Sequence, residues 1–208
     1  MRELHSNLAE NRLRSVEHNL RCASGVAFNA VVDDELTGIQ AYAVYESRNV
    51  ELSPELADAL NDDALAWVIA HEVAHLELDH QARLVESRDR HDEAFQKGLG
   101  ELATKVRRGE GRFLRDMTTR LGLLANWSVG VLLDRRNVER EADSRAVELA
   151  LEAGYGPEGA FEALIALERE DFDASSYRLG RHIANILQDH PLTEVRIARL
   201  KRRLVNQD

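Results

Sequence analysis

The 208-residue sequence predicts a single, mostly helical α+β domain (residues 1–208) with one small mixed sheet. Three observations support this fold class. Apolar residues recur at helical spacing through most of the chain, only three prolines occur, and the Val-, Tyr- and Phe-rich segments are confined to residues 25–52. Because 44% of the residues are apolar and 31% are charged, the composition is that of a folded globular protein.

The first quarter of the chain is expected to form a helix followed by the sheet. Apolar residues at helical spacing predict an amphipathic helix over residues 1–24. The stretches "GVAFNAVVDD" and "QAYAVYESRNVEL" are typical of strands, and the "DDELTG" between them is typical of a turn. Residues 25–52 should therefore hold two or three short strands.

Residues 53–85 are expected to be helical. Ser53 before Pro54 predicts a short capped helix, and Asn61 before two aspartates predicts a second helix start. No strong helix breaker follows, so the second helix should continue to about Val85.

The rest of the chain should also be mostly helical. Residues 86–136 are interpreted as a polar, mobile segment with loops at its glycines, followed by a buried apolar helix in "LGLLANWSVGVLL" (residues 121–133). Within residues 137–208, Asn137 is expected to cap a helix that Gly154 ends. A helix that starts at the next proline should follow, and then two more in "SSYRLGRHIANILQ" and "TEVRIARLKRRLV".

Charge and cysteine content exclude several classes of function. A net charge of −10 argues against electrostatic binding to nucleic acid or anionic lipid and favours a protein or peptide partner. The single cysteine excludes an intrachain disulfide and a thiolate metal cage.

The most apolar run, thirteen residues, is too short to span a bilayer as a helix. The charged N-terminus without an apolar signal region predicts a cytoplasmic protein if Met1 is the native start.

The stretch "WVIAHEVAHLELDH" sets two histidines and a glutamate inside an apolar helix. His71 and His75 are four residues apart, so both imidazoles lie on one helix face, close enough to hold one metal ion. Glu72 lies beside the pair, where its carboxylate can accept the proton of a metal-bound water. This H-E-x-x-H arrangement is typical of zinc metalloproteases. His80 is turned off the ligand face, so it is not expected to bind the metal.

A catalytic zinc ion normally has three protein ligands, so a separate helix must contribute one. The best candidate is Glu139 in "NVEREAD". Asp143, four residues later on the same helix face, is placed to orient a ligand imidazole. Taken alone, this spacing is a weak signal because most such pairs on acidic helices are exposed charges.

Three stretches together resemble one family of enzymes. "AHEVAHLELDH", "EREADSRAVELALEAGYGP" and "DHPLTEVRIARL" follow one another as in the CAAX prenyl protease and HtpX-like zinc metallopeptidases, of the gluzincin type. The resemblance covers the chain from about Val31 to Leu200 and is to the compact soluble branch, because the membrane-spanning helices of the integral members are missing. It implies a zincin-like metallopeptidase domain whose small sheet packs on the zinc-binding helix.

The resemblance also implies roles for individual residues. One Zn²⁺ per chain would be held with Glu139 as the third ligand, and Asp143 would be the partner of His71. His190 and Arg196 would approach from the far side of the cleft. His190 would act catalytically, as a hydrogen-bond donor to the developing oxyanion, while Arg196 would anchor its loop or bind the ligand-bearing helix. Soluble relatives often work in the bacterial cell envelope, so the periplasm is the alternative location if a leader has been removed.

The resemblance further implies a strand at the edge of the cleft, against which an extended substrate pairs. Gln40, Ala41, Tyr42 and Ala43 stand in that place, with Gln40 where asparagine is usual and "ESRN" where a glycine-containing turn commonly follows. The expected partner is therefore an unfolded or extended polypeptide.

Three functions are open from the sequence. The leading one is a zinc-dependent endopeptidase that hydrolyses peptide bonds with a metal-activated water and Glu72 as general base. The second is a zinc-binding but latent or non-catalytic protein of a chaperone-like or regulatory kind, which the altered edge strand favours. The third is a helical interaction module without metal, whose C-terminal helices form a docking surface.

Overall fold

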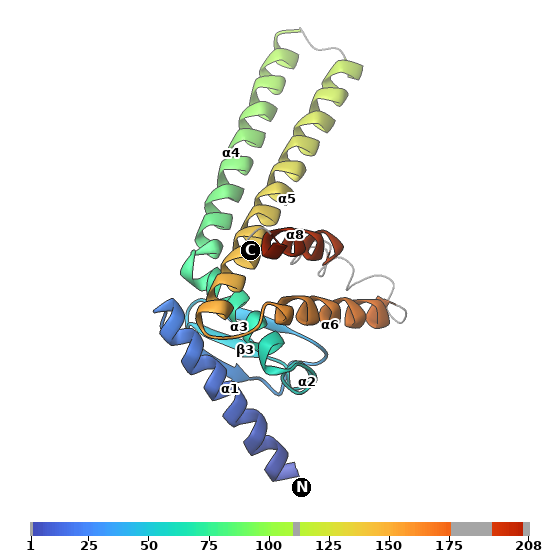
Figure 1. Cartoon of the computed structure of the whole chain (residues 1–208). Helices are drawn as coiled ribbons and strands as arrows, with labels where there is room; N and C mark the ends of the chain where they lie inside the picture. The colour runs from blue at the N-terminus through green and yellow to red at the C-terminus, as the bar shows by residue number, and fades with distance from the viewer. Residues whose placement is uncertain (1, 110–112, 176–192, 206–208) are drawn as a thin grey trace. The chain divides into compact units, whose positions relative to one another are not determined.

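The computed structural model describes residues 2–109, 113–175 and 193–205. Its elements are α1 (Arg2–Ser24), β1 (Asn29–Val32), β2 (Ala41–Val44), β3 (Asn49–Leu52), α2 (Pro54–Ala59), α3 (Asp62–Glu77), α4 (His80–Arg107), α5 (Phe113–Glu152), α6 (Glu158–Ser175) and α8 (Thr193–Val205) (Figure 1). The chain divides into two compact units, Met1–Leu78 with Glu139–Asp208, and Asp79–Val138. The predicted α+β class, mostly helical with a small mixed sheet, is confirmed.

The sheet of the larger unit has the strand order β1–β3–β2. β1 is parallel to β3, with Ala30 opposite Val50, and β2 is antiparallel to β3, with Ala43 opposite Val50. Within this sheet β2 is therefore an edge strand. Both β2 and β3 pack on α3, so the predicted packing of the sheet on the helix that carries His71 is confirmed.

α3 is the central helix of the larger unit. The side chain of Asn61 caps it by accepting a hydrogen bond from the Ala64 backbone N–H at 2.9 Å. Residues 64–74 are all buried, because α1, α6 and the sheet pack around the helix. A helix that is apolar on all sides is stable only when it is enclosed in this way. His71 consequently lies inside the protein.

Two predictions about the helices after Asn61 are wrong. α3 ends at Glu77 and α4 begins at His80, because Asp79 has a φ of 48°, a left-handed conformation that aspartate tolerates better than most residues. The expected loops after residue 86 are absent as far as Arg107, where α4 is one continuous helix.

α5 is a single helix of 40 residues where two helices were predicted. Asn137 lies inside this helix and not at its start, because the apolar run continues directly into the segment that carries Glu139. The run is not buried as predicted, since Leu121 is 58% exposed and Leu133 is 51% exposed. Gly154 follows the end of α5 with a φ of 87°, as expected of a residue that terminates a helix. None of the described helices is long and apolar enough to cross a membrane.

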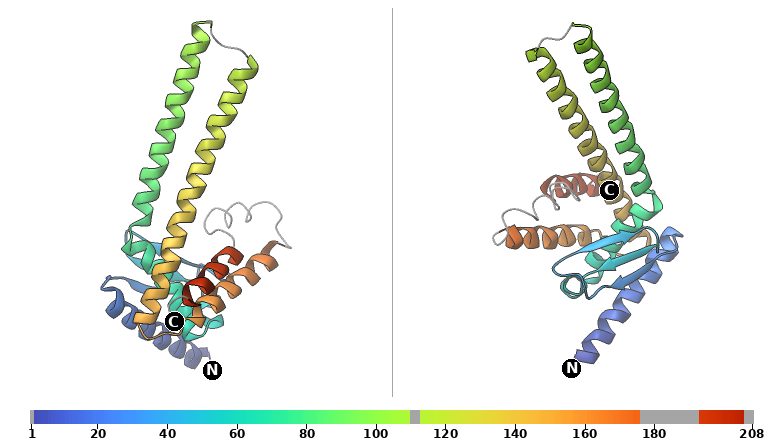
Figure 2. Two further views of the ribbon diagram at one scale, coloured as in Figure 1. Left: turned by 45° about the horizontal axis from the view of Figure 1, so that its top comes forward. Right: turned by 180° about the vertical axis from the view of Figure 1, so that it is seen from behind.

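The smaller unit consists of α4 and the first part of α5, which lie side by side as an antiparallel pair in both views of Figure 2. Gly130 allows the close approach, because a Cβ at this position would lie 2.3 Å from Cε1 of His91. The same imidazole lies 2.9 Å, through Nε2, from Oδ2 of Asp134. Trp127 Nε1 donates a hydrogen bond to Oδ1 of Asp92 at 2.6 Å. These contacts fix the register of the two helices.

The C-terminal helices return to the larger unit. The helices predicted after Gly154 and in "TEVRIARLKRRLV" are confirmed as α6 and α8. α6 packs on α3, and α8 packs on α6. The helix predicted in "SSYRLGRHIANILQ" lies outside the described residues.

Candidate metal centre

Three side chains of the metal-ligand type meet between α3 and the second part of α5. The Nε2 atoms of His71 and His75, one helical turn apart, are 3.1 Å from each other. Glu139 reaches them from α5, with Oε2 at 3.4 Å from His71 Nε2 and Oε1 at 3.5 Å from His75 Nε2. In the described parts of the chain, this is the one group of three or more such residues that could hold a metal ion.

The spacing of these atoms fits a tetrahedral zinc site. Zinc binds imidazole nitrogen and carboxylate oxygen at about 2.0–2.2 Å, and the tetrahedral angle then puts neighbouring ligand atoms about 3.3–3.5 Å apart. The Glu139 carboxylate, at 3.4 Å from His71 Nε2 through Oε2 and 3.5 Å from His75 Nε2 through Oε1, lies in this range, and the two Nε2 atoms, at 3.1 Å, are slightly closer. We call His71, His75 and Glu139 the ligand triangle. Three protein ligands leave the fourth position of a tetrahedron open, as a catalytic site requires.

Asp143 lies behind His71, one turn after Glu139 on α5. Its Oδ1 atom is 3.2 Å from Nδ1 of His71, on the side of the ring opposite the ligand atom Nε2. A carboxylate at Nδ1 favours the tautomer that carries its proton there, which leaves the Nε2 lone pair available for a metal ion. Asp143 is thus placed to orient the imidazole.

Arg196 binds Asp143 from α8. Its Nε donates to Oδ2 at 2.9 Å and its Nη2 donates to Oδ1 at 2.6 Å, which is a two-pronged contact. The guanidinium also lies 5.9 Å from the ring centroid of Trp67 on α3. Of the two roles expected for Arg196, this geometry corresponds to binding of the ligand-bearing helix.

The carboxylates control the charge of the metal-free site. Burial alone would lower the pKa of His71, but hydrogen bonding to Asp143 and Glu139 outweighs it and raises this pKa to about 9. Burial conversely opposes ionisation of Asp143, yet His71 and Arg196 lower its pKa to about 2. The site therefore stabilises positive charge at the position of His71.

Glu72 lies on α3 next to His71 and is 6% exposed. It is not part of the group of three residues that could hold a metal ion. A buried carboxylate beside a metal site is suited to proton transfer. His190, the other predicted catalytic residue, lies outside the described residues.

The predicted substrate-edge residues occupy the edge of the sheet. Ala41, Tyr42 and Ala43 belong to β2, and Gln40 precedes it. The carbonyl of Gln40 accepts a hydrogen bond from the Ser53 N–H at 2.9 Å, so alternate residues from Gln40 onward pair with β3. By this alternation Ala41 and Ala43 direct their backbone groups away from β3. The side chain of Gln40 donates to the Thr37 carbonyl at 2.6 Å, within its own loop.

Two contacts that support the site had no signal in the sequence. The Tyr45 hydroxyl, just after β2, donates to the His75 carbonyl at 3.1 Å and ties the edge strand to the ligand helix. Arg145 on α5 donates two hydrogen bonds to Glu77 on α3, from Nε to Oε2 at 2.8 Å and from Nη2 to Oε1 at 3.0 Å. The partners are 30 and 68 positions apart along the chain, and neither pair forms a recognisable motif.

The chain is similar to known proteins over most of its length. Residues 7–204 match the model of peptidase family M48. The chain is 26% identical over 192 residues to the beta-barrel assembly-enhancing protease of Escherichia coli O157:H7, and equally to those of Escherichia coli K12 and Shigella flexneri. Each alignment covers 92% of this chain but 37% of the relative, so the chain spans little more than a third of the relatives' length. No solved structure matches the chain significantly.

The family match extends over nearly the whole chain and includes the helices that carry His71, His75 and Glu139. The chain therefore belongs to peptidase family M48.

Proposed function

We propose that this protein is a zinc-dependent endopeptidase whose metal ion is held by His71, His75 and Glu139. The observation that carries the proposal is the convergence of three buried ligand side chains. The two imidazole Nε2 atoms lie 3.1 Å apart, and the carboxylate of Glu139 lies 3.4 Å from one and 3.5 Å from the other, close enough for all three residues to bind one zinc ion. Membership of a peptidase family supports the same reaction class.

Each residue around the ligand triangle has a separate role in peptide hydrolysis. When bound at such a site, zinc lowers the pKa of water at its open position to near 7 and polarises a carbonyl group. Glu72 takes the proton from the attacking water and delivers it to the leaving amine as the peptide bond breaks. Asp143 holds His71 in the orientation that directs Nε2 to the ligand triangle, and Arg196 holds Asp143.

The substrate is an extended polypeptide that adds a strand to β2. Ala41 and Ala43 have backbone N–H and C=O groups that do not pair with β3, so they can form the hydrogen bonds of an added strand. The contact between Tyr45 and His75 supports this role because it fixes the edge strand to the helix that carries two of the ligands. His190 is proposed to donate a hydrogen bond to the oxyanion.

The test is cleavage of casein by the wild-type protein and by Glu72→Gln, with zinc content measured on the same preparations. The wild type is expected to cleave, and to stop after treatment with a chelator. Glu72→Gln should retain zinc and lose activity by at least about a hundredfold, because general acid–base catalysis contributes about 10²–10⁴-fold. Glu93→Gln, at an exposed position on α4, is the matched control and should behave as the wild type.

Equal activity in wild type and Glu72→Gln would remove Glu72 as the general base. Zinc at one ion per chain without cleavage of casein would instead support the latent or regulatory alternative. Absence of bound zinc would leave only a helical interaction module.

A further inference from the structure

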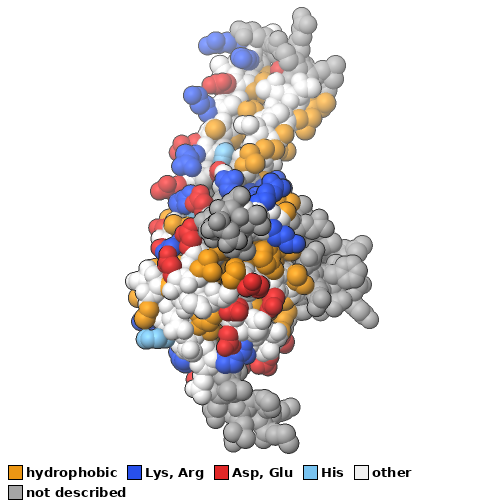
Figure 3. All heavy atoms as spheres, in the orientation of Figure 1, with side chains coloured by type: hydrophobic (Ala, Val, Ile, Leu, Met, Phe, Trp, Pro, Cys, Tyr) orange, Lys and Arg blue, Asp and Glu red, His pale blue; other side chains and the backbone are white. Residues whose placement is uncertain are grey.

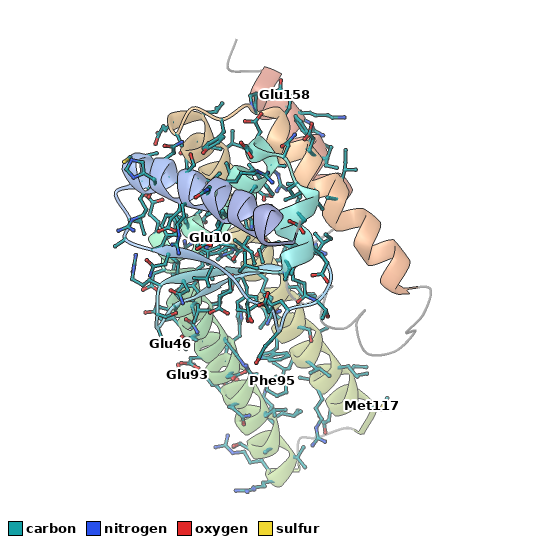
Figure 4. The ribbon with its side chains drawn as sticks, turned by 90° about the horizontal axis from the view of Figure 1, so that it is seen from below. Glu10, Glu46, Glu93, Phe95, Met117 and Glu158 are labelled. Carbon is teal, nitrogen blue, oxygen red and sulfur yellow. The ribbon has the colours of Figure 1, made fainter. Side chains whose placement is uncertain are left out.

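The outer side of the helical pair in the smaller unit carries an apolar stripe, which we call the α5 stripe. Its members are large apolar side chains of α5 that are 45–58% exposed: Met117, Leu121, Leu124, Val129, Leu132 and Leu133. Figure 4 shows Met117 on the side of α5 away from α4, whereas Phe95 of α4 points between the two helices. Contiguous exposed apolar patches of this kind are uncommon on soluble proteins and mark interaction sites.

The part of the α5 stripe that follows Arg120 has no charged residue within it. The sequence from Leu121 to Leu133 contains no Asp, Glu, Lys or Arg. Contacts with α4 involve other residues of α5, such as Trp127 and Asp134, so the stripe is not needed to hold the pair together. Its exposure is therefore not explained by the packing of this unit.

The end of the helical pair next to the stripe is basic, although the chain as a whole has a net charge of −10. In this region the structure describes the side chains of residues 97–109 and 116–120, which include five basic and two acidic ones and therefore have a net charge of +3. The basic residues are Lys97, Lys105, Arg107, Arg108 and Arg120. Figure 3 shows orange side chains along the α5 edge of this pair and blue ones toward its far end.

We infer that the α5 stripe and the basic end of the helical pair together bind an anionic lipid surface. An amphipathic element with apolar residues on one face and cations beside it lies in the interface of a bilayer, where the apolar side chains enter the acyl boundary and the cations meet the headgroups. The run of 13 residues is too short to span a bilayer, so the element lies along its surface.

The negative charge of the whole chain does not oppose this contact. Charges interact over about 10 Å or less at ordinary salt concentrations, so a lipid surface responds to the local charge of the segment that touches it. That local charge is positive in residues 97–109 and 116–120. A net charge of −10 for the whole chain therefore does not oppose binding of this segment to anionic lipid.

A second copy of the chain fits the stripe less well than lipid does. Arg120 flanks the apolar run on one side, and Arg136 lies just beyond its other end; both are exposed. Two stripes paired in either direction would place arginine near arginine. Anionic headgroups would satisfy the cations at both ends.

The experiment is co-sedimentation of the full chain with vesicles of equimolar phosphatidylglycerol and phosphatidylcholine, compared with vesicles of phosphatidylcholine alone. The wild type is expected to bind the anionic vesicles at least about tenfold more tightly, and binding should weaken as salt is raised, since each Lys or Arg near an anionic surface contributes about 1 kcal/mol, or about fivefold. Lys105→Glu/Arg107→Glu and Leu121→Gln/Leu132→Gln should each weaken binding at least about tenfold.

Matched pairs from the larger unit control for charge and for apolar surface. Arg199→Glu/Arg202→Glu changes two exposed arginines of α8, and Val31→Gln/Ile165→Gln changes two exposed apolar residues. Both pairs should bind anionic vesicles as the wild type does. Since all substituted side chains are exposed, every variant should keep the wild-type circular dichroism spectrum.

The proposal is overturned if the wild type does not sediment with anionic vesicles, or if it binds neutral vesicles equally. It is also overturned if the control pairs lose binding as much as the α5-stripe and basic-end variants. A dimer in light scattering that Leu121→Gln/Leu132→Gln dissociates would assign the stripe to a second copy instead. None of these outcomes depends on peptidase activity.

Discussion

A single oxygen atom, Oδ1 of Asp143, lies 3.2 Å from Nδ1 of His71 and 2.6 Å from Nη2 of Arg196. Asp143 therefore joins α3, which carries two candidate ligands, to α5, which carries the third, and to α8. The orientation of the His71 imidazole depends on this carboxylate.

Asp143→Asn is expected to lower zinc affinity by about 10–100-fold, because loss of a carboxylate behind a ligand imidazole weakens metal sites by this factor. A competition titration against a chromophoric chelator measures it. Asp89→Asn, which removes an exposed aspartate of α4, should leave the affinity unchanged. Unchanged affinity in Asp143→Asn would show that the carboxylate does not support the ligand.

The stability of the metal-free protein should fall as pH rises from about 6.5 to about 9. The pKa of His71 is raised from 6.5 to about 9, so the protonated imidazole stabilises the folded state fully below pH 6.5, and this contribution is lost as pH passes through 9. Zinc needs the neutral imidazole, so the rise in melting temperature on adding zinc should grow over the same range. Melting temperatures of the chelator-treated wild type and of His71→Gln, measured across this pH range, test the prediction. If the melting temperatures of the two proteins changed with pH in the same way, His71 would not be the cause of the loss of stability.

Ala43→Pro should weaken substrate binding with little change in stability. Proline removes the backbone N–H of Ala43, which points away from β3, and proline is tolerated at such an edge position. The loss of one hydrogen bond to the substrate strand, about 1 kcal/mol, should raise KM for an extended peptide about fivefold. Ala43→Val keeps the N–H and serves as the control. Identical KM values for the two variants would exclude pairing at this position.

The contact between Arg145 and Glu77 should stabilise the fold by about 1–2 kcal/mol, since it is two-pronged and its side chains are only 23% and 25% exposed. Denaturant unfolding of Arg145→Gln, Glu77→Gln and the double variant gives the coupling energy. The control cycle uses Arg12 and Asp62, whose carboxylate is 61% exposed and whose coupling should be about 0.5 kcal/mol or less. Equal coupling in both cycles would contradict a special role for Arg145.

The local part of the site could be predicted from the sequence, because helix geometry alone sets it. His71 and His75 share a helix face by their spacing, and the cap at Asn61 follows from local hydrogen bonding. The approach of Glu139 to the histidines depends on how α5 packs against α3, which no local pattern encodes. The sequence pattern around Glu139 made it a candidate for the third metal ligand, and the family resemblance implied that it is this ligand.

The errors also have physical causes. Asn137 has the composition of a cap, but the helix before it continues, so cap preference was overridden by an uninterrupted helical sequence. Asp79 breaks the predicted helix because a single residue in the left-handed conformation is enough to end a helix. The presence of an aspartate in the sequence does not by itself predict this conformation. Burial of residues 121–133 was inferred from their apolar character, which does not reveal whether other protein or a different environment covers them.

The central claim is tested most directly by the zinc content of wild type, Glu139→Gln and Glu141→Gln, purified without a histidine tag and measured by mass spectrometry of the metal. Glu141 lies two residues further along α5 and is not part of the ligand triangle, so its variant is the matched control. We expect one zinc ion per chain in wild type and Glu141→Gln, and strongly reduced zinc in Glu139→Gln. Full zinc occupancy in Glu139→Gln, or none in the wild type, would contradict the account.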